Sequence, residues 1–211
     1  MSVISVSVFG KNYAGLEALC EYFRGLGIDA SILPDKNPEA VEQGFIKHDM
    51  GYIKVMGRNF DLVTIRTKGT TSSSSSSIGG VTIASKEKVP FEYHHIVRAN
   101  VADEGVLKVK LKKKTKGLLS KEIVAVSWEG GLFTTALNSD AELNASIMKF
   151  ITSDDDIKVE PDKKKQLIRI IFSRPSVIRS GLLQGFTFDR SFLPKEAVDV
   201  IDKIAGLARV L

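Results

Sequence analysis

The chain has 211 residues, 43% of them hydrophobic and 26% charged, with a formal net charge of +5 at pH 7. This length fits one medium domain or two small ones, with a core large enough to fold without disulfides or metal ions. The composition is far from that of disordered chains and of membrane proteins, and it therefore excludes both classes.

The N-terminus and the cysteine content indicate a cytoplasmic protein. The segment MSVISVSVFGKN lacks the basic start, apolar run and cleavage site of a secretory signal. No uncharged apolar stretch approaches the ~18 residues of a membrane span. Cys20 is the only cysteine, so an internal disulfide cannot form, which agrees with a reducing compartment.

The first predicted element in chain order is a strand at residues 2–9, where apolar and polar residues alternate. Residues 28–34 predict a second strand, and Pro38 at a first helical position predicts a short helix. Two further strands flank residues 57–59, which predict a hairpin turn. Between the first two strands, a helix is predicted from about residue 13 to 26, with an apolar stripe at spacings of three and four: Leu16, Leu19, Cys20, Phe23 and Leu26.

A segment rich in threonine, serine and glycine follows at residues 69–80 and includes six consecutive serines. It has almost no apolar surface to bury, which predicts a flexible linker or a long loop. We therefore expect two α+β lobes, at residues 1–68 and 81–211. A serine-rich phosphate loop is the alternative, but neither the lysine nor the helix start of a P-loop accompanies these serines.

The second half of the chain combines strands with two helices. One helix is predicted after a capping box formed by Ser139 and Glu142, and the other spans about 194–210. Because hairpins outnumber crossovers, the expected fold class is α+β, with a mainly antiparallel sheet and about four helices. The predicted strands lie at about 91–101, 105–113, 122–128, 157–160 and 166–173.

The two halves share short patterns, which indicate two related strand-helix-strand units. Val6-Ser7-Val8-Phe9-Gly10 resembles Val126-Ser127-Trp128-Glu129-Gly130. Each pattern is followed by a helix with Leu-x-Ala and then by a strand that ends in Pro-Asp-Lys. The matches are few, so chance similarity is the alternative explanation.

The basic charge of the chain is concentrated in one stretch. Residues 105–121 contain seven lysines and no acid, so the remaining chain has 23 basic residues against 25 acids. On a strand, the lysines at even positions point away from the apolar residues at odd positions, which predicts one core face and one lysine face. The next strand, 122–128, is mostly apolar on both faces and is expected to be central, with the lysine strand on or near an edge.

The lysine strand has two interpretations. Lysines on an exposed strand prevent edge-to-edge aggregation, a role that needs no partner. Alternatively, they bind nucleic acid, an acidic protein or an anionic membrane surface. The stretch offers no aromatic residue for stacking on bases and no arginine for bidentate recognition of guanine, so such binding is expected to be non-specific. The candidate polyanion-binding residues are Lys108, Lys110, Lys112, Lys113, Lys114 and Lys116.

A second candidate site, for a small ligand, is the turn formed by Trp128, Glu129, Gly130 and Gly131. A strand that ends in paired glycines before a helix exposes backbone N–H groups, and the following threonines add hydroxyl donors. A tight turn beside a core tryptophan explains the same residues without a ligand. The pattern matches neither a dinucleotide-binding loop nor a P-loop.

Candidate catalytic and metal-binding groups are sparse, and we expect no metal and no cofactor. The histidines are His48 and the adjacent pair at 94 and 95, which on a strand point to opposite faces, one in the core and one in solvent. The three aspartates at 154–156 lack calcium-loop spacing and indicate a solvated turn. Cys20 is expected to be buried.

These observations predict a non-enzymatic binding or scaffolding protein, with the lysine strand as the best candidate surface for contact with a polyanion. The alternative is an enzyme or small-ligand-binding protein with its site in a cleft between the two lobes, near Trp128, to which Glu129, Arg98 and a histidine contribute. The sequence leaves the question of enzymatic activity open. The apolar C-terminal helix is expected to pack within its own chain, or alternatively on a second subunit in a homo-oligomer.

Overall fold

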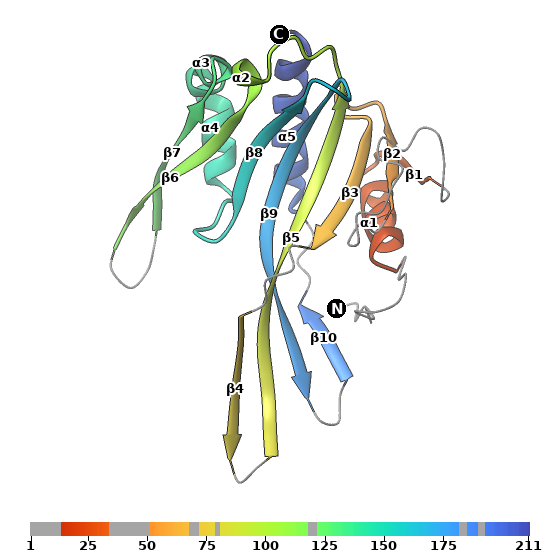
Figure 1. Ribbon diagram of the computed structural model, residues 1–211, viewed down its shortest axis with the longest axis vertical. Coiled ribbons are helices and arrows are strands. Elements are labelled where there is room, and N and C mark those ends of the chain that lie inside the picture. Colours follow the sequence, from red (N-terminus) through yellow and green to blue (C-terminus); the bar gives the residue numbers. More distant parts are fainter. Residues whose placement is uncertain are drawn as a thin grey trace.

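The computed structural model describes residues 14–33, 51–67, 72–78, 81–117, 122–181, 185–189 and 193–211. Within them, ten strands form one antiparallel sheet (Figure 1). Eight strands follow the order β1-β2-β3-β5-β9-β8-β6-β7, while β4 pairs with β5 and β10 pairs with β9. The strands are β1 (Asp29–Ile32), β2 (Ile53–Met56), β3 (Leu62–Thr67), β4 (Ser72–Ile78), β5 (Val81–Arg98), β6 (Val109–Lys116), β7 (Glu122–Gly130), β8 (Asp156–Asp162), β9 (Leu167–Gly181) and β10 (Gly185–Asp189).

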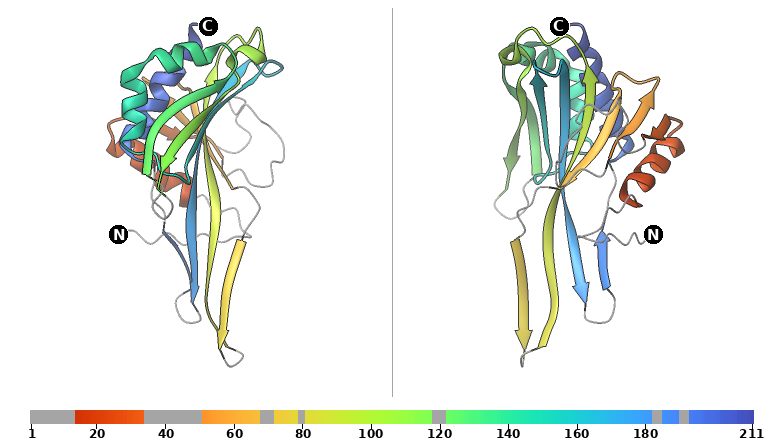
Figure 2. Two further views of the ribbon diagram at one scale, coloured as in Figure 1. Left: turned by 90° about the vertical axis from the view of Figure 1, so that its left-hand side faces the viewer. Right: turned by 45° about the vertical axis from the view of Figure 1, so that its right-hand side comes forward.

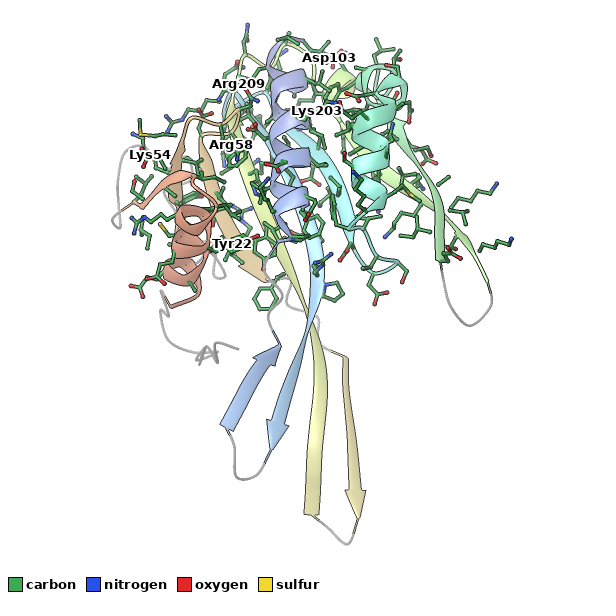
Figure 3. All side chains as sticks on the ribbon, turned by 180° about the vertical axis from the view of Figure 1, so that it is seen from behind. Tyr22, Lys54, Arg58, Asp103, Lys203 and Arg209 are labelled. Atoms are coloured by element: carbon green, nitrogen blue, oxygen red, sulfur yellow. The ribbon has the colours of Figure 1, made fainter. Side chains whose placement is uncertain are left out.

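The predicted α+β class is confirmed. Helices α1, α4 and α5 lie on one face of the sheet, the face turned toward the viewer in Figure 3. α5 crosses the middle of that face and contacts β5, β9 and α4. The helices are α1 (Ala14–Gly25), α2 (Glu104–Leu107), α3 (Phe133–Ser139), α4 (Ala141–Met148) and α5 (Lys195–Arg209).

The main core lies between the sheet and these helices. The apolar stripe predicted for the first helix is buried, apart from Leu26, which is half-buried. The C-terminal helix buries one wide apolar face within its own chain, as the sequence predicts. Its buried residues are Ala197, Val198, Val200, Ile201, Ile204, Ala205 and Ala208, which leaves Val210 and Leu211 as its exposed apolar end.

Strands β5 and β9 are much longer than their neighbours. They pair from Ser85↔Ser180 to Arg98↔Leu167. Their far ends, with β4 and β10 at the sides, form an extension that projects from the helix-covered body (Figures 1 and 2). The long β5–β9 pair thus joins the extension to the body of the protein.

The predicted loop at residues 69–80 is wrong for residues 72–78, which form β4. This strand pairs with β5 from Ser72↔Lys88 to Ile78↔Val81. Serine side chains offer no apolar surface, but the pairing satisfies backbone N–H and C=O groups of the strand. The sheet also crosses the expected lobe boundary, because β3 pairs with β5 from Leu62↔Ile96 to Thr67↔Phe91.

Two further expectations need correction near the lysine strand. Residues 104–107 form the short helix α2 instead of the start of a strand, because the Asp103 carboxylate accepts the Gly105 N–H at 2.8 Å and caps a helical turn. In the described sheet, β7 is an edge strand and not a central one. Two of its apolar residues, Val124 and Ala125, are exposed, Val124 by 44%, and Ile123 and Val126 are half-buried. An irregularity in the β6–β7 pairing falls beside Val124.

The helix predicted after Ser139 is present, but its cap is Asp140. The Asp140 carboxylate accepts the Leu143 N–H at 2.8 Å, and the Ser139 hydroxyl instead donates to the Ala136 carbonyl within α3. Lys203 of α5 also reaches Asp140 at 2.9 Å, and in Figure 3 Lys203 lies on the side of α5 toward α4. These contacts lower the pKa of Asp140, with the backbone hydrogen bond as the largest cause.

The strand expected at residues 2–9, the short helix after Asn37 and His48 all lie outside the described residues. So do parts of the first unit of the expected internal repeat. In the described part, each unit has a helix that leads to a strand, α1 to β1 and α4 to β8. The relation between the two units stays a prediction.

Replacing Asp140 by alanine tests the cap. Loss of the Leu143 N–H acceptor should lower the free energy of unfolding by about 1 kcal/mol. Glu142→Ala is the matched control, because Glu142 also contacts Lys203, at 3.1 Å, but is almost fully exposed. Its effect should stay within about 0.5 kcal/mol. Urea denaturation measures both values, and equal losses would contradict a capping role for Asp140.

Candidate functional site

The predicted alternation of the lysine strand is confirmed. Val109 and Leu111 are buried, whereas Lys108, Lys110 and Lys112 are exposed. In the cross-strand register, Lys110 and Lys112 stand opposite Glu129 and Ser127 of β7. The even-numbered lysines therefore line the sheet face that is opposite to the main core.

Two of these lysines have acidic partners. Lys110 Nζ lies 3.2 Å from Asp156, and Lys112 Nζ lies 3.0 Å from Glu129. The lysine side chains of both pairs are about half exposed. Exposed pairs of this kind contribute about 0–1 kcal/mol, so an incoming phosphate can exchange for the carboxylate at little cost.

Lys113 is placed differently from the other candidate lysines. It points to the helix-covered side, and its ammonium donates to the carbonyl oxygens of Thr152 at 3.2 Å, Ser153 at 2.8 Å and Asp155. Burial lowers the pKa of Lys113, against the opposing effect of nearby aspartates. The structure thus assigns this lysine to the turn before β8.

The far part of β6 and β7 forms a two-stranded projection, which we call the β6–β7 ribbon (residues 111–116 and 122–128). β6 pairs with β8 only at Val109 and Lys110, and beyond that point it pairs with β7 alone. The ribbon projects from the body on the left-hand side of Figure 1. Lys114 and Lys116 are exposed on it and form no ion pair within the described residues, although Glu122 is opposite Lys116 in the register.

The second predicted site, at Trp128, is a packed turn. Trp128 is buried, and its indole N–H donates to the Asn144 side chain at 3.1 Å. The Asn138 side chain accepts the Trp128 backbone N–H at 2.8 Å and donates to its carbonyl at 3.0 Å. These contacts attach the end of β7 to helices α3 and α4.

Gly130 and Gly131 allow the close approach of two backbone segments. A Cβ on Gly131 would lie 1.9 Å from the Gly105 carbonyl oxygen, and one on Gly130 would lie 2.3 Å from that of Lys108. Gly130 also has a φ of 129°, which disfavours other residues. The glycines are therefore explained by the packing of β7 against α2 and the start of β6.

Two of the donors expected to bind an anion at this turn are engaged within the chain. The Gly131 N–H donates to the Lys108 carbonyl at 2.9 Å, and the Thr134 hydroxyl donates to the Gly131 carbonyl at 2.8 Å. A hollow of about 370 Å³ beside the turn is lined by Gly130, Gly131, Thr134 and residues of the α2 segment. Because these two donors are engaged, the hypothesis of an anion site at this turn loses support.

His94 and His95 point to opposite faces of the sheet, as predicted. The prediction that one of them is exposed to solvent is wrong. His94 and His95 stand opposite Thr64 and Val63, respectively, on β3, and both are buried. His95 lies in the main core, where its ring is edge-on to that of Phe60 and the two ring centres are 4.9 Å apart. Burial lowers the pKa of His95 to about 3. His94 lies on the other face with Glu92, because alternate residues of β5 share a face.

A cluster of buried polar side chains surrounds His94, and it was not predicted from the sequence. His94 Nε2 lies 3.1 Å from Glu92, the Lys158 ammonium is 3.9 Å from Glu92, and the Thr64 hydroxyl is fully buried on the neighbouring strand. Burial is the main cause of a lowered His94 pKa, opposed by the hydrogen bond to Glu92. The period-two spacing of Glu92 and His94 was the available signal.

The expected cleft residues are far apart. Glu129 lies on β7, whereas Arg98 and His94 lie on β5, and β9, β8 and β6 stand between these two strands. At about 4.8 Å for each step between neighbouring strands, Glu129 lies about 19 Å from β5. One site cannot hold Glu129 together with these two residues without a large rearrangement of the sheet.

The aspartates at 154–156 do not form a uniformly solvated turn. Asp155 is 2% exposed, and its carboxylate accepts two hydrogen bonds from Arg174, at 2.8 and 2.6 Å. No group of three or more metal-ligating side chains occurs among the described residues. Cys20 is buried in the core, as predicted, and burial raises the pKa of its thiol.

A larger hollow, of about 610 Å³, lies between the end of α4, the turn before β8 and the start of α5. Its lining combines acidic side chains, among them Asp154 and Glu196, with the basic side chains of Lys149 and Arg174. This mixed lining favours no single charge of ligand. No helix in the described part of the chain is long and apolar enough to cross a membrane.

Replacing His95 by leucine tests its buried, neutral state. The unfolded chain takes up a proton near pH 6.5, whereas folded His95 does so only near pH 3. Below pH 6.5 the native protein should therefore lose up to about 1.4 kcal/mol per pH unit through this residue. Urea unfolding between pH 7 and 4 should give a shallower pH dependence for the variant, and an unchanged dependence would contradict the assignment.

Replacing Gly131 by alanine tests the close backbone approach. The added Cβ would force α2 away from the turn, so the free energy of unfolding should fall by about 3 kcal/mol or more. Gly25→Ala is the matched control, because a Cβ there meets nothing within 4 Å. The control should change stability by less than about 1 kcal/mol. Similar effects of the two changes in thermal denaturation would contradict the packing argument.

Comparison with known proteins gives no match to this chain among protein-family models, curated proteins or solved structures. The functional proposal is therefore based on the residues and their geometry.

Proposed function

We propose that this protein is a non-enzymatic binding protein that contacts the phosphates of double-stranded nucleic acid through the β6–β7 ribbon. The observation that carries the proposal is the placement of Lys114 and Lys116. Both are exposed on a projecting ribbon and form no ion pair within the described residues. Lys110 and Lys112 extend the same row toward the body. Each forms an exposed ion pair in which a phosphate can take the place of the carboxylate.

The shape of the ribbon suits a duplex. Two paired strands fit the major groove, which is about 12 Å wide, and such ribbons are an established way of contacting DNA. Side chains two residues apart on a strand are about 6.6–6.8 Å apart, which is about the rise along the duplex axis over two phosphates of one DNA strand. A row of lysines at this spacing can therefore follow the backbone.

The composition of the ribbon favours contact with phosphates over recognition of sequence. Its described residues include no arginine, and its one aromatic residue, Trp128, is buried in the body. Bidentate recognition of guanine and stacking on unpaired bases both need groups that the exposed part of the ribbon lacks. We therefore infer salt-sensitive binding with little sequence preference.

A small-ligand or enzymatic function near Trp128 has less support. The Gly131 N–H and the Thr134 hydroxyl are engaged in hydrogen bonds within the chain, and Glu129 is far from the histidine and Arg98 that were expected to share its cleft. The binding proposal needs no rearrangement of the sheet.

Fluorescence anisotropy of a labelled duplex across a salt series tests the proposal. The native protein should bind with a dissociation constant of about 1–100 μM at moderate salt, and affinity should fall steeply as salt rises. The double variant Lys114→Gln, Lys116→Gln should bind more weakly. Its log–log salt dependence should be shallower by about 0.9 for each lost phosphate contact.

The matched control is the double variant Lys164→Gln, Lys195→Gln, which removes the same charge from exposed positions outside the ribbon. It should bind the duplex almost as the native protein does. Equal weakening by both double variants would show that net charge, and not the ribbon, governs binding. Absence of binding at low salt would overturn the proposal, and equally effective competition by poly-glutamate would reassign the ribbon to acidic partners in general.

A further inference from the structure

Lys113 differs from every other lysine of the candidate set in what it contacts. Its ammonium is surrounded by three backbone carbonyl oxygens, those of Thr152, Ser153 and Asp155. An ammonium has three protons to donate, so these carbonyls use its full capacity. A phosphate can reach this group only if the contacts with the turn are given up.

The turn that receives Lys113 is itself held firmly. The Asp155 carboxylate accepts the Thr152 N–H at 2.9 Å and pairs with Arg174 of β9 through two hydrogen bonds. Arg174 also donates to the Phe150 carbonyl at 3.2 Å, and its guanidinium lies 5.2 Å from the centre of the Phe172 ring. A continuous series of contacts thus links Lys113 to the central strand β9.

The position of Lys113 along β6 gives this link its importance. The pairing of β6 with β8 ends at Lys110, so residues beyond it are paired only with β7. A two-stranded ribbon on its own is marginally stable in water and is free to change its angle to the body. Lys113 is the most distal residue of the ribbon for which the described residues show a hydrogen bond from the side chain to the body.

We propose that Lys113 is a positioning residue that anchors the β6–β7 ribbon to the turn before β8 and holds it ready for binding. This inference rests on the proposed function, because the anchored ribbon is the one assigned to phosphate contact. An anchored ribbon loses less conformational freedom on binding, which raises affinity without adding a contact. Lys113 therefore acts through the placement of Lys112, Lys114 and Lys116 and does not touch the ligand.

Lys113→Met, which keeps most of the side chain and removes the ammonium, tests the anchor in two ways. Amide hydrogen exchange in residues 112–116 and 122–127 should become faster, at least about tenfold, because the ribbon opens more often. Duplex affinity should fall by about tenfold, with a salt dependence as steep as that of the native protein. Lys114→Gln is the control. Its ribbon amides should exchange as fast as those of the native protein, and its log–log salt dependence of affinity should be shallower by about 0.9.

Asp155→Asn is the second variant, because it weakens the turn and leaves every lysine in place. It should also accelerate ribbon exchange and weaken binding with an unchanged salt dependence, provided that thermal denaturation still gives a cooperative transition. If Lys113→Met makes the salt dependence shallower, as Lys114→Gln does, Lys113 contacts phosphate and the proposal is overturned. Native exchange and affinity in Lys113→Met would overturn it as well.

The exchange measurement separates this proposal from the proposed function. If the native protein does not bind the duplex, the function fails, but faster ribbon exchange in Lys113→Met would still establish the anchor. If the duplex binds and exchange is unchanged in Lys113→Met, the function stands and the anchor fails.

Discussion

The pairing of β5 with β9 is the interaction on which the rest of the fold depends. It runs from Ser85↔Ser180 to Arg98↔Leu167, and each of the other strand ladders attaches, directly or in sequence, to one of its sides. On one face its apolar residues form the floor on which α5 packs. On the other face, Glu92 and His94 are buried in a polar group. Because side chains alternate between the two faces of a strand, this pair supplies apolar residues to the helix-covered face and these polar residues to the other.

Strand geometry explains why one run of lysines has several roles. Neighbouring side chains on β6 point to opposite faces, so Lys112 and Lys113 are one position apart and meet different surroundings. Lys112 forms an exposed pair with Glu129, whereas Lys113 is hydrogen-bonded to a turn on the core side. Composition alone describes such a run as one patch. The register divides it into a row that faces solvent and an anchor.

Much of the fold could be predicted from periodic patterns. The apolar stripe of α1, the alternation on β6 and the buried face of α5 each follow from residues a fixed distance apart, and a core-facing pattern has few alternatives. Ser72–Ile78 could not be predicted in this way, because its strand is set by backbone pairing with β5 and not by its side chains. The edge position of β7 was missed for a related reason. Its apolar residues are typical of a central strand, but β7 lies at the end of the described strand order, which leaves Val124 and Ala125 exposed.

The candidate site depends on contacts between residues far apart in the sequence, which no local pattern contains. From the sequence, Asp155 is expected to be part of a solvated acidic run. In the structure it is buried, because its carboxylate pairs with Arg174 and its backbone carbonyl accepts a hydrogen bond from Lys113. The acids that pair with the lysine row, Asp156 and Glu129, belong to the base of the ribbon, where β6 meets β8. The hydrogen bonds from the ribbon to the body lie at its base, at Trp128, and partway along β6, at Lys113. Beyond Lys113 the described residues show neither such a hydrogen bond nor an acidic partner for Lys114 and Lys116, and this exposed positive charge is the basis of the proposed contact with phosphates.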